Sequence, residues 1–359
     1  MDWSDIGDRV RECRLAARMS QDDLARAVGL ERSVIAKVEA GTRKIDAVEL
    51  ARLSTTLDVP LGHFLSARST VLSRRAELVE DTDSDVARRS YRLEAKLSAW
   101  VRDIRQLTGA GALELPTLLA YDGAVTDADR AREAARWTRD RLGLGSDPIE
   151  SLMTVCEAAG QLVLVTDLPG EGASLRDGDV AAAVVSRELD PGRRRATAAH
   201  ELGHLVLGDE YSSDLGVSAS RADREMVIDA YAAELLLPSQ VVADAVVADG
   251  VRRMLITLAA RYRTSWSLAV GQASYVGVVD QASAAGLSPA RPTRAELLDA
   301  VGWAPQPDLD AVRVPPGYAH AVMGAWRSGA VTAARAVELM HGQITREDLP
   351  HREEADLAT

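Results

Sequence analysis

Hydrophobic positions recur with a helical period over most of the chain, and short uninterrupted apolar runs occur near its middle. Apolar residues spaced three or four positions apart predict amphipathic helices, as over residues 84–107, where Ser84 would cap the first turn. The runs Gln161–Thr166 and Val180–Ser186 predict buried strands, joined by a glycine-rich turn over Pro169–Gly178. The pattern therefore predicts a mostly α-helical chain with a small β-sheet, an α+β fold.

Further helical segments lie on both sides of these strands, separated by glycine, proline and polar turns. Before the strands they are predicted at 6–18, 21–28, 32–39, 48–57, 61–65, 127–142 and 148–159. After the strands they are predicted at 195–209, 225–238, 294–300, 319–326 and 332–340, with two more helices inside 254–278. Pro191–Arg195 is predicted to be a loop and Val312–Gly317 a linker.

These signals divide the chain into four parts. Residues 1–66 are predicted to be an all-α N-terminal domain, 67–125 a helical linker, 126–245 the domain with the strands, and 246–359 a helical C-terminal domain. Charges occur in blocks through the second part, which favours a solvated connecting helix there, with a dimerisation helix as the alternative.

Residues 1–66 show the order helix, tight turn, helix that many DNA-binding proteins use. Ser20 is a good N-cap with Asp23 three residues on, Gly29 ends that helix, and a second short helix is predicted over Arg32–Glu39. The segment resembles the phage-repressor-like (Cro/C1, or XRE) DNA-binding family over nearly all of its length. The alternative is a helical dimerisation module that does not bind DNA.

Basic residues cluster on and after the second of these helices, where phosphates and base edges would lie. The cluster and the resemblance together imply DNA contacts by Gln21 at the DNA backbone, by Arg32, Ser33, Ala36 and Lys37 in the groove, and by Arg43 and Lys44 beside them. A single motif of this kind binds weakly, so a homodimer is expected for specific recognition.

Composition narrows the class of protein. The 359 residues carry a formal net charge of −12, which argues against general nucleic-acid affinity and leaves only a local DNA-binding patch. No apolar run is long enough to cross a membrane, and the first residues lack a signal-peptide pattern. The two cysteines, Cys13 and Cys156, lie far apart, so neither a disulfide framework nor a cysteine zinc site is indicated. A cytoplasmic protein is expected.

The segment His200-Glu-Leu-Gly-His204 carries the clearest chemistry in the chain. On a helix, His200 and His204 lie one turn apart on the same face, where both imidazoles can bind one zinc ion. Glu201 would project beside them, within reach of a water on that ion. Most other positions nearby are apolar, which indicates a buried helix. The alternative is a chance match, or two histidines that are ordinary core side chains.

A second predicted helix supplies a candidate third ligand. Glu225 and Asp229 stand four positions apart on one helix face, so Glu225 would complete the site and Asp229 would orient a ligand histidine. Glu234 lies two and a half turns beyond Glu225 and points to the opposite face. The alternative is that Glu225 and Asp229 are solvated surface acids.

These two segments together resemble the ImmA/IrrE family of zinc metallopeptidases. The resemblance rests on Ala198–Gly208 and on Glu225-x-x-x-Asp-Ala-Tyr-Ala-Ala-Glu-Leu-Leu-Leu-Pro238. In that family the second segment usually has another glutamate where this chain has Val227, an alanine at Ile228, and a phenylalanine at Tyr231. The helix-face geometry favours Glu225 as the ligand.

The resemblance implies a zincin-like metallopeptidase domain that holds Zn²⁺ through His200, His204 and Glu225 and uses Glu201 as the catalytic base. A substrate strand is expected to pair with Ala181–Ser186 as an edge strand. Members of this family cleave a partner transcriptional repressor and so switch on stress or mobile-element genes. The alternative function is a DNA-binding transcription regulator without peptidase activity, one that senses metal or a partner, with an antitoxin-like regulator as one form of it.

Overall fold

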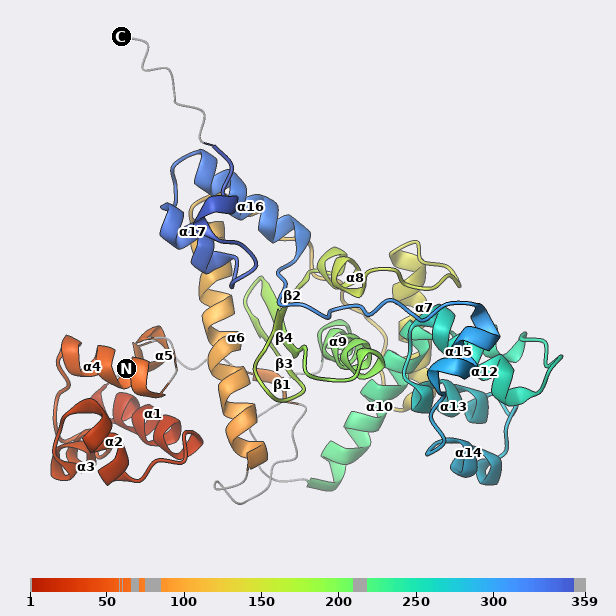
Figure 1. Cartoon of the computed structure of the whole chain (residues 1–359), viewed down its shortest axis with the longest axis horizontal. Helices are drawn as coiled ribbons and strands as arrows, with labels where there is room; N and C mark the ends of the chain where they lie inside the picture. Colours follow the sequence, from red (N-terminus) through yellow and green to blue (C-terminus); the bar gives the residue numbers. More distant parts are fainter. Residues whose placement is uncertain are drawn as a thin grey trace, which may run out of the picture.

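The computed structural model describes residues 2–57, 59, 61–65, 71–74, 85–208 and 218–351 (Figure 1). The side chains of 71–74, 85–91 and 218–222 are outside this description, as is the predicted helix cap Ser84. Within the described ranges, no helix is both long and apolar enough to cross a membrane.

The N-terminal domain contains α1 (Trp3–Ala16), α2 (Gln21–Val28), α3 (Arg32–Glu39), α4 (Ala47–Leu57) and α5 (Leu61–Leu65). The Ser20 hydroxyl accepts the Asp23 N–H and the Asp23 carboxylate accepts the Ser20 N–H, which starts α2 as predicted. Gly29, with a φ of +71°, ends it. The predicted helix, tight turn and helix are confirmed, and their apolar faces form one core that includes Leu24, Ile35, Leu53 and Phe64.

The sheet contains β1 (Val71–Arg74), β2 (Gln161–Thr166), β3 (Gly172–Asp177) and β4 (Val180–Ser186) in the order β1-β3-β4-β2. β2 runs parallel to β4, and β3 runs antiparallel to both β4 and β1. The predicted bounds of β2 and β4 are confirmed, and both strands are buried along their whole length. Such continuous apolar runs are typical of strands covered on both faces.

Two predictions about this sheet are wrong. Pro169–Gly178 is not simply a turn, because it contains β3. Nor is the strand over Ala181–Ser186 an edge strand, because β4 pairs with β3 on one side and with β2 on the other. A substrate strand therefore has no open edge of β4 to pair with.

Two helical layers cover the sheet (Figure 1). Alternate side chains of β2 and β4 pack on one face against α8 (Leu152–Ala158), α9 (Pro191–Val206) and α10 (Ser218–Leu236), with α7 (Ala128–Arg141) behind α10. The prediction of a loop over Pro191–Arg195 is wrong, because proline is well suited to a first helical position and α9 begins at Pro191.

The opposite face of the sheet is covered by α6 (Asp85–Gly109), although the charge pattern predicts a solvated linker helix there. That interpretation is wrong. The Trp100 indole donates to the Leu162 carbonyl at 2.9 Å, and its ring lies 4.4 Å from that of Tyr318. Six apolar side chains of α6 are fully buried in this layer, namely Leu93, Leu97, Trp100, Val101, Ile104 and Leu107. The charged blocks thus belong to the outer side of a core helix.

The C-terminal helices belong to two cores, not to one. α11 (Ser239–Ala243), α12 (Val251–Tyr262), α13 (Trp266–Tyr275), α14 (Gln281–Leu287) and α15 (Arg294–Val301) form a core beside α10. α16 (Pro316–Arg327) and α17 (Ala333–Leu339) instead pack on α6, followed by a short 3-10 turn over Arg346–Asp348. The predicted linker over 312–317 is in part a sheet contact, because Arg313 and Val165 exchange both backbone hydrogen bonds.

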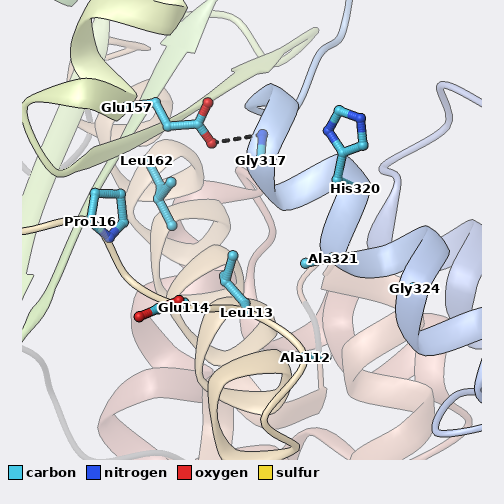
Figure 2. Close-up of a pocket in the computed structure, with 10 residues that line it drawn as sticks. All are labelled: Ala112, Leu113, Glu114, Pro116, Glu157, Leu162, Gly317, His320, Ala321 and Gly324. Carbon is cyan, nitrogen blue, oxygen red and sulfur yellow. Dashed lines mark hydrogen bonds between the residues drawn. The ribbon is translucent and has the colours of Figure 1, made fainter.

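The start of α16 is anchored on α8, next to a surface cleft of about 460 Å³ (Figure 2). The Glu157 carboxylate accepts the Gly317 N–H at 2.9 Å. A Cβ at Gly317 would lie 2.7 Å from that carboxylate, so a larger residue there would displace the end of the Glu157 side chain. Burial raises the pKa of Glu157, and the backbone N–H groups of Gly317 and Tyr318 oppose that shift. None of the predicted site residues lines this cleft.

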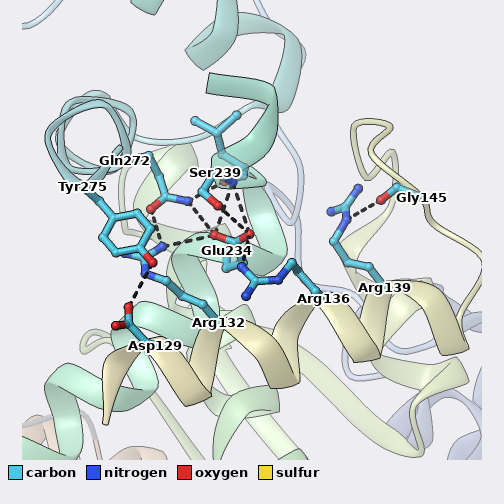
Figure 3. A network of polar contacts seen from close by, with 10 residues as sticks. Asp129, Arg132, Arg136, Arg139, Gly145, Glu234, Ser239, Gln272 and Tyr275 are labelled. Atoms are coloured by element: carbon cyan, nitrogen blue, oxygen red, sulfur yellow. Dashed lines mark hydrogen bonds and ion pairs between the residues drawn. The ribbon is translucent and has the colours of Figure 1, made fainter. Parts of the chain in front are cut away.

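A buried polar network joins α7, α10 and α13 (Figure 3). The Glu234 carboxylate is fully buried and accepts from Arg132 and Arg136, each at 3.2 Å. It also accepts the Ser239 N–H at 3.2 Å, and Gln272 donates to it at 3.4 Å. Glu234 thus lies away from Glu225, as predicted, and serves to fix three helices to one another.

Removing the central carboxylate of this network should destabilise the fold. Glu234→Ala leaves the buried Arg132 guanidinium without its ionic partner, so we expect the free energy of unfolding to fall by about 3–5 kcal/mol. The matched control is Glu133→Ala on α7, whose pair with Arg130 is exposed, so that its loss should change the free energy of unfolding very little. Urea unfolding followed by circular dichroism measures both. Equal, small losses would contradict the assigned role of Glu234.

Candidate metal centre

The close approach of α9 and α10 places the candidate site. A Cβ at Gly203 would lie 2.9 Å from the Tyr231 ring and 3.0 Å from Ile228, so only glycine lets the two helices pack this tightly. The Tyr231 hydroxyl donates to Thr138 on α7 at 3.0 Å, and burial raises the pKa of this phenol. Tyr231 therefore fills the core, which leaves it unsuited to donate to a substrate.

His200, His204 and Glu225 meet where these helices face each other. Each offers one ligand atom, and the three atoms lie within 4.8 Å of one another. His200 Nε2 is 3.0 Å from Glu225 Oε2 and 3.1 Å from His204 Nε2. Both histidines are fully buried, whereas the Glu225 side chain is 27% exposed. The structure thus brings together the three residues predicted as metal ligands.

The hydrogen bond made by the other ring nitrogen of His200, Nδ1, indicates what this cluster can bind. His200 Nδ1 lies 2.8 Å from Asp229 Oδ1, and a carboxylate can only accept, so Nδ1 carries the proton. In the neutral ring the lone pair of Nε2 then faces both Glu225 and His204 Nε2. This lone pair and the Glu225 carboxylate are both acceptors, so at 3.0 Å they repel each other unless a proton or a metal cation lies between them. The cluster therefore fits a metal ion, with Asp229 orienting a ligand ring.

The side chain at position 227 does not point toward the histidines, so a ligand at this position could not take the place of Glu225. Val227 lies two residues further along α10, about 200° around the helix axis. Its side chain is buried among the apolar residues that cover the sheet. The position at which this chain departs from the ImmA/IrrE pattern thus belongs to the core and lies outside the histidine cluster.

Glu201 is held by the strand that the sequence analysis missed. Its Oε2 accepts the Ser174 hydroxyl at 2.6 Å, and its backbone carbonyl accepts Gln161 Nε2 at 2.9 Å. Glu201 and Ser174 are both fully buried, and Glu201 Oε1 has no hydrogen-bond partner among the described residues. One carboxylate oxygen is therefore fixed, and the other is a buried acceptor without a partner among the described residues.

Ser174 was not predicted, because Gly172–Asp177 was assigned to a turn. The alternation along this strand could have revealed it. Ala173 and Leu175 face α6, so Ser174 must face α9. Cys156, by contrast, has no part in the site, since burial raises the pKa of its thiol to about 12 and keeps it protonated.

The residues predicted to contact DNA differ in their exposure and in their contacts within the domain. Arg32, Ser33 and Lys37 are exposed on α3, Ala36 is half-buried between them, and Lys44 is exposed beyond the helix. The two remaining residues are engaged within the domain, since Gln21 donates to Glu39 at 2.8 Å and Arg43 forms a two-pronged ion pair with Glu49 at 2.8 and 2.9 Å.

Comparison with known proteins finds two regions of the chain that are similar to known families. Residues 10–64 match the helix-turn-helix family, and residues 156–270 match the peptidase M78 family, described as the IrrE N-terminal-like domain. An uncharacterized transcriptional regulator in the ATPase CF(0) region of Rhodospirillum rubrum is 38% identical over 61 residues, which are 17% of this chain and 56% of that protein. No solved structure matches. Residues 10–64 are therefore similar to helix-turn-helix domains, and residues 156–270 are similar to the IrrE N-terminal-like domain of the peptidase M78 family.

Proposed function

We propose that this protein is a zinc-dependent metallo-endopeptidase fused to a DNA-binding domain. The observation that carries the proposal is the convergence of His200, His204 and Glu225, with Asp229 on the outer nitrogen of His200. Two imidazoles and one carboxylate are a common ligand set for catalytic zinc. The match of residues 156–270 to a peptidase family supports the same reading.

The residues of the chain would divide the work as follows. His200, His204 and Glu225 would hold the ion, which when bound supplies Lewis acidity toward a peptide carbonyl. Glu201 Oε1, which has no hydrogen-bond partner among the described residues, would take a proton from the attacking water and pass it to the leaving amine. Ser174 fixes the other oxygen of Glu201, so that the carboxylate keeps one orientation during both transfers.

The substrate we propose is a partner transcriptional repressor, whose cleavage would switch on stress or mobile-element genes. The helix-turn-helix domain supports DNA binding, so the peptidase would act at or near promoters. Binding as a homodimer and a cytoplasmic location complete the proposal. The competing function is a transcription regulator without peptidase activity. The relative from Rhodospirillum rubrum supports this alternative, because it is named a transcriptional regulator.

Metal content should depend on the carboxylates that face the histidines. Purified wild-type protein is expected to hold about one zinc per chain, and Glu225→Ala to lose it. Asp229→Ala should weaken zinc binding by about 10- to 100-fold, because His200 loses its orienting partner. Asp223→Ala, an exposed carboxylate on the same helix, is the control and should keep its zinc. Mass spectrometry of the metal measures all four, and a full zinc complement in Glu225→Ala would contradict the ligand set.

Peptidase activity should depend on Glu201 without any change in metal content. Glu201→Gln keeps the size of the side chain and removes its basicity, so we expect cleavage of fluorescent casein to fall by about 100- to 10,000-fold. The control Glu188→Gln changes an exposed carboxylate and should cleave normally. If zinc-loaded Glu201→Gln still switches target genes in the cell as the wild type does, the regulator without peptidase activity is the correct function.

DNA binding should depend on the exposed basic residues of α3. Lys37→Ala is expected to weaken binding to a mixed-sequence 20-base-pair duplex several-fold and to lower the salt dependence by about one phosphate contact. The control Arg130→Ala removes the same charge from an exposed site on α7, outside the helix-turn-helix domain. Fluorescence anisotropy at several salt concentrations measures both. Equal binding by the two variants would place the DNA contact elsewhere.

A further inference from the structure

β3 contributes the side chain that holds the candidate catalytic carboxylate of Glu201. It contributes Ser174, which donates to Glu201, and Gly172, where a Cβ would lie 3.3 Å from Glu201 Oε1. One side of β3 pairs with β4. The other side, its outer edge, would present unpaired backbone groups beside Glu201 if nothing covered it.

In this structure β1 covers that edge. β1 pairs antiparallel with β3, with Val71 opposite Leu175, Ser73 opposite Ser174 and Arg74 opposite Ala173. The backbone of β1 thus runs alongside Ser174, the residue that holds Glu201, and Cα atoms of β1 lie within 8 Å of Cα atoms of α9. Figure 1 shows β1 at the end of the sheet, beside β3.

Three features of β1 indicate an exchangeable occupant. It is only four residues long, and its register with β3 shifts between Val71 and Ser73. A pairing of this length makes few ladder hydrogen bonds, each of modest net value. β1 also lies between α5 and α6, so it reaches β3 from the segment that follows the DNA-binding domain.

We propose that the outer edge of β3 is a peptide-binding surface, which β1 occupies in the free protein and from which an extended segment of a protein partner displaces it. Added strands of this kind bind through backbone hydrogen bonds, and they tolerate many side chains. β1 competes as part of the same chain, at high effective concentration, so the surface opens only to a partner that pairs better. That this partner is the cleaved substrate rests on the proposed peptidase function.

Amide hydrogen exchange of the full-length protein tests the surface without any need for cleavage. Ser73 and Arg74 are adjacent in the regular part of β1, so their N–H groups point to opposite sides and one of them faces β3. The double variant S73P/R74P removes both donors. The control S73T/R74Q makes the same change in charge and keeps both.

In S73P/R74P we expect the β3 amides that face β1 to exchange at least ten times faster than in the wild type and in the control. The β3 amides that face β4 should stay protected in all three proteins. Adding the synthetic peptide Ser-Thr-Val-Leu-Ser-Arg-Arg-Ala-Glu, which is residues 69–77, should restore the protection in S73P/R74P. Equal exchange in all three proteins, or no restoration at millimolar peptide, would overturn the proposal.

The same pattern is expected when Glu201→Gln is added to each protein, because strand pairing does not need the carboxylate. Failure of the peptidase function therefore leaves this test intact. Where casein is cleaved, S73P/R74P should cleave it faster than the control. Equal rates together with faster exchange would remove the substrate as the partner and keep the surface.

Discussion

The contact between α9 and α10 at Gly203 is the constraint on which the candidate site depends. Glycine is poor in a helix interior, at a cost of about 1 kcal/mol relative to alanine. Here its missing side chain admits the Tyr231 ring and Ile228, which brings α10 close enough for Glu225 to reach His200. A larger residue at this position would separate the two helices and, with them, the third ligand from the other two.

Three buried polar groups of α9 at the site are held by groups from other elements. Asp229 on α10 fixes His200, Ser174 on β3 fixes the Glu201 carboxylate, and Gln161 on β2 holds the Glu201 carbonyl. Further along α9, the buried Arg195 pairs with Asp308 in the segment before α16. Because burial of polar groups is costly unless they are hydrogen-bonded, this set ties α9 to four other parts of the chain. The site is therefore rigid before any ligand arrives.

The sequence predicted the elements whose signals are local. The cap at Ser20, the apolar runs of β2 and β4, and the four-residue spacing of His200 and His204 each depend on neighbours in the chain, and the structure contains all of them. The predictions that were wrong concern segments whose structure depends on residues distant in the sequence. The residues near Gly172–Asp177 do not indicate that this segment pairs with β4. The charged blocks of α6 do not indicate that its other face is buried against strands that begin about 50 residues later.

α6 contributes side chains to two hydrophobic cores. Ala95 belongs to the core of the helix-turn-helix domain, where the Arg102 side chain also lies against Gly62, while Trp100 and its neighbours belong to the core beneath the sheet. A helix that completes two cores couples their unfolding. Any ligand that binds only the folded N-terminal domain, DNA included, then raises the stability of the domain that contains the sheet by mass action, although the ligand does not contact that domain. The fusion is thus a thermodynamic linkage as well as a covalent one.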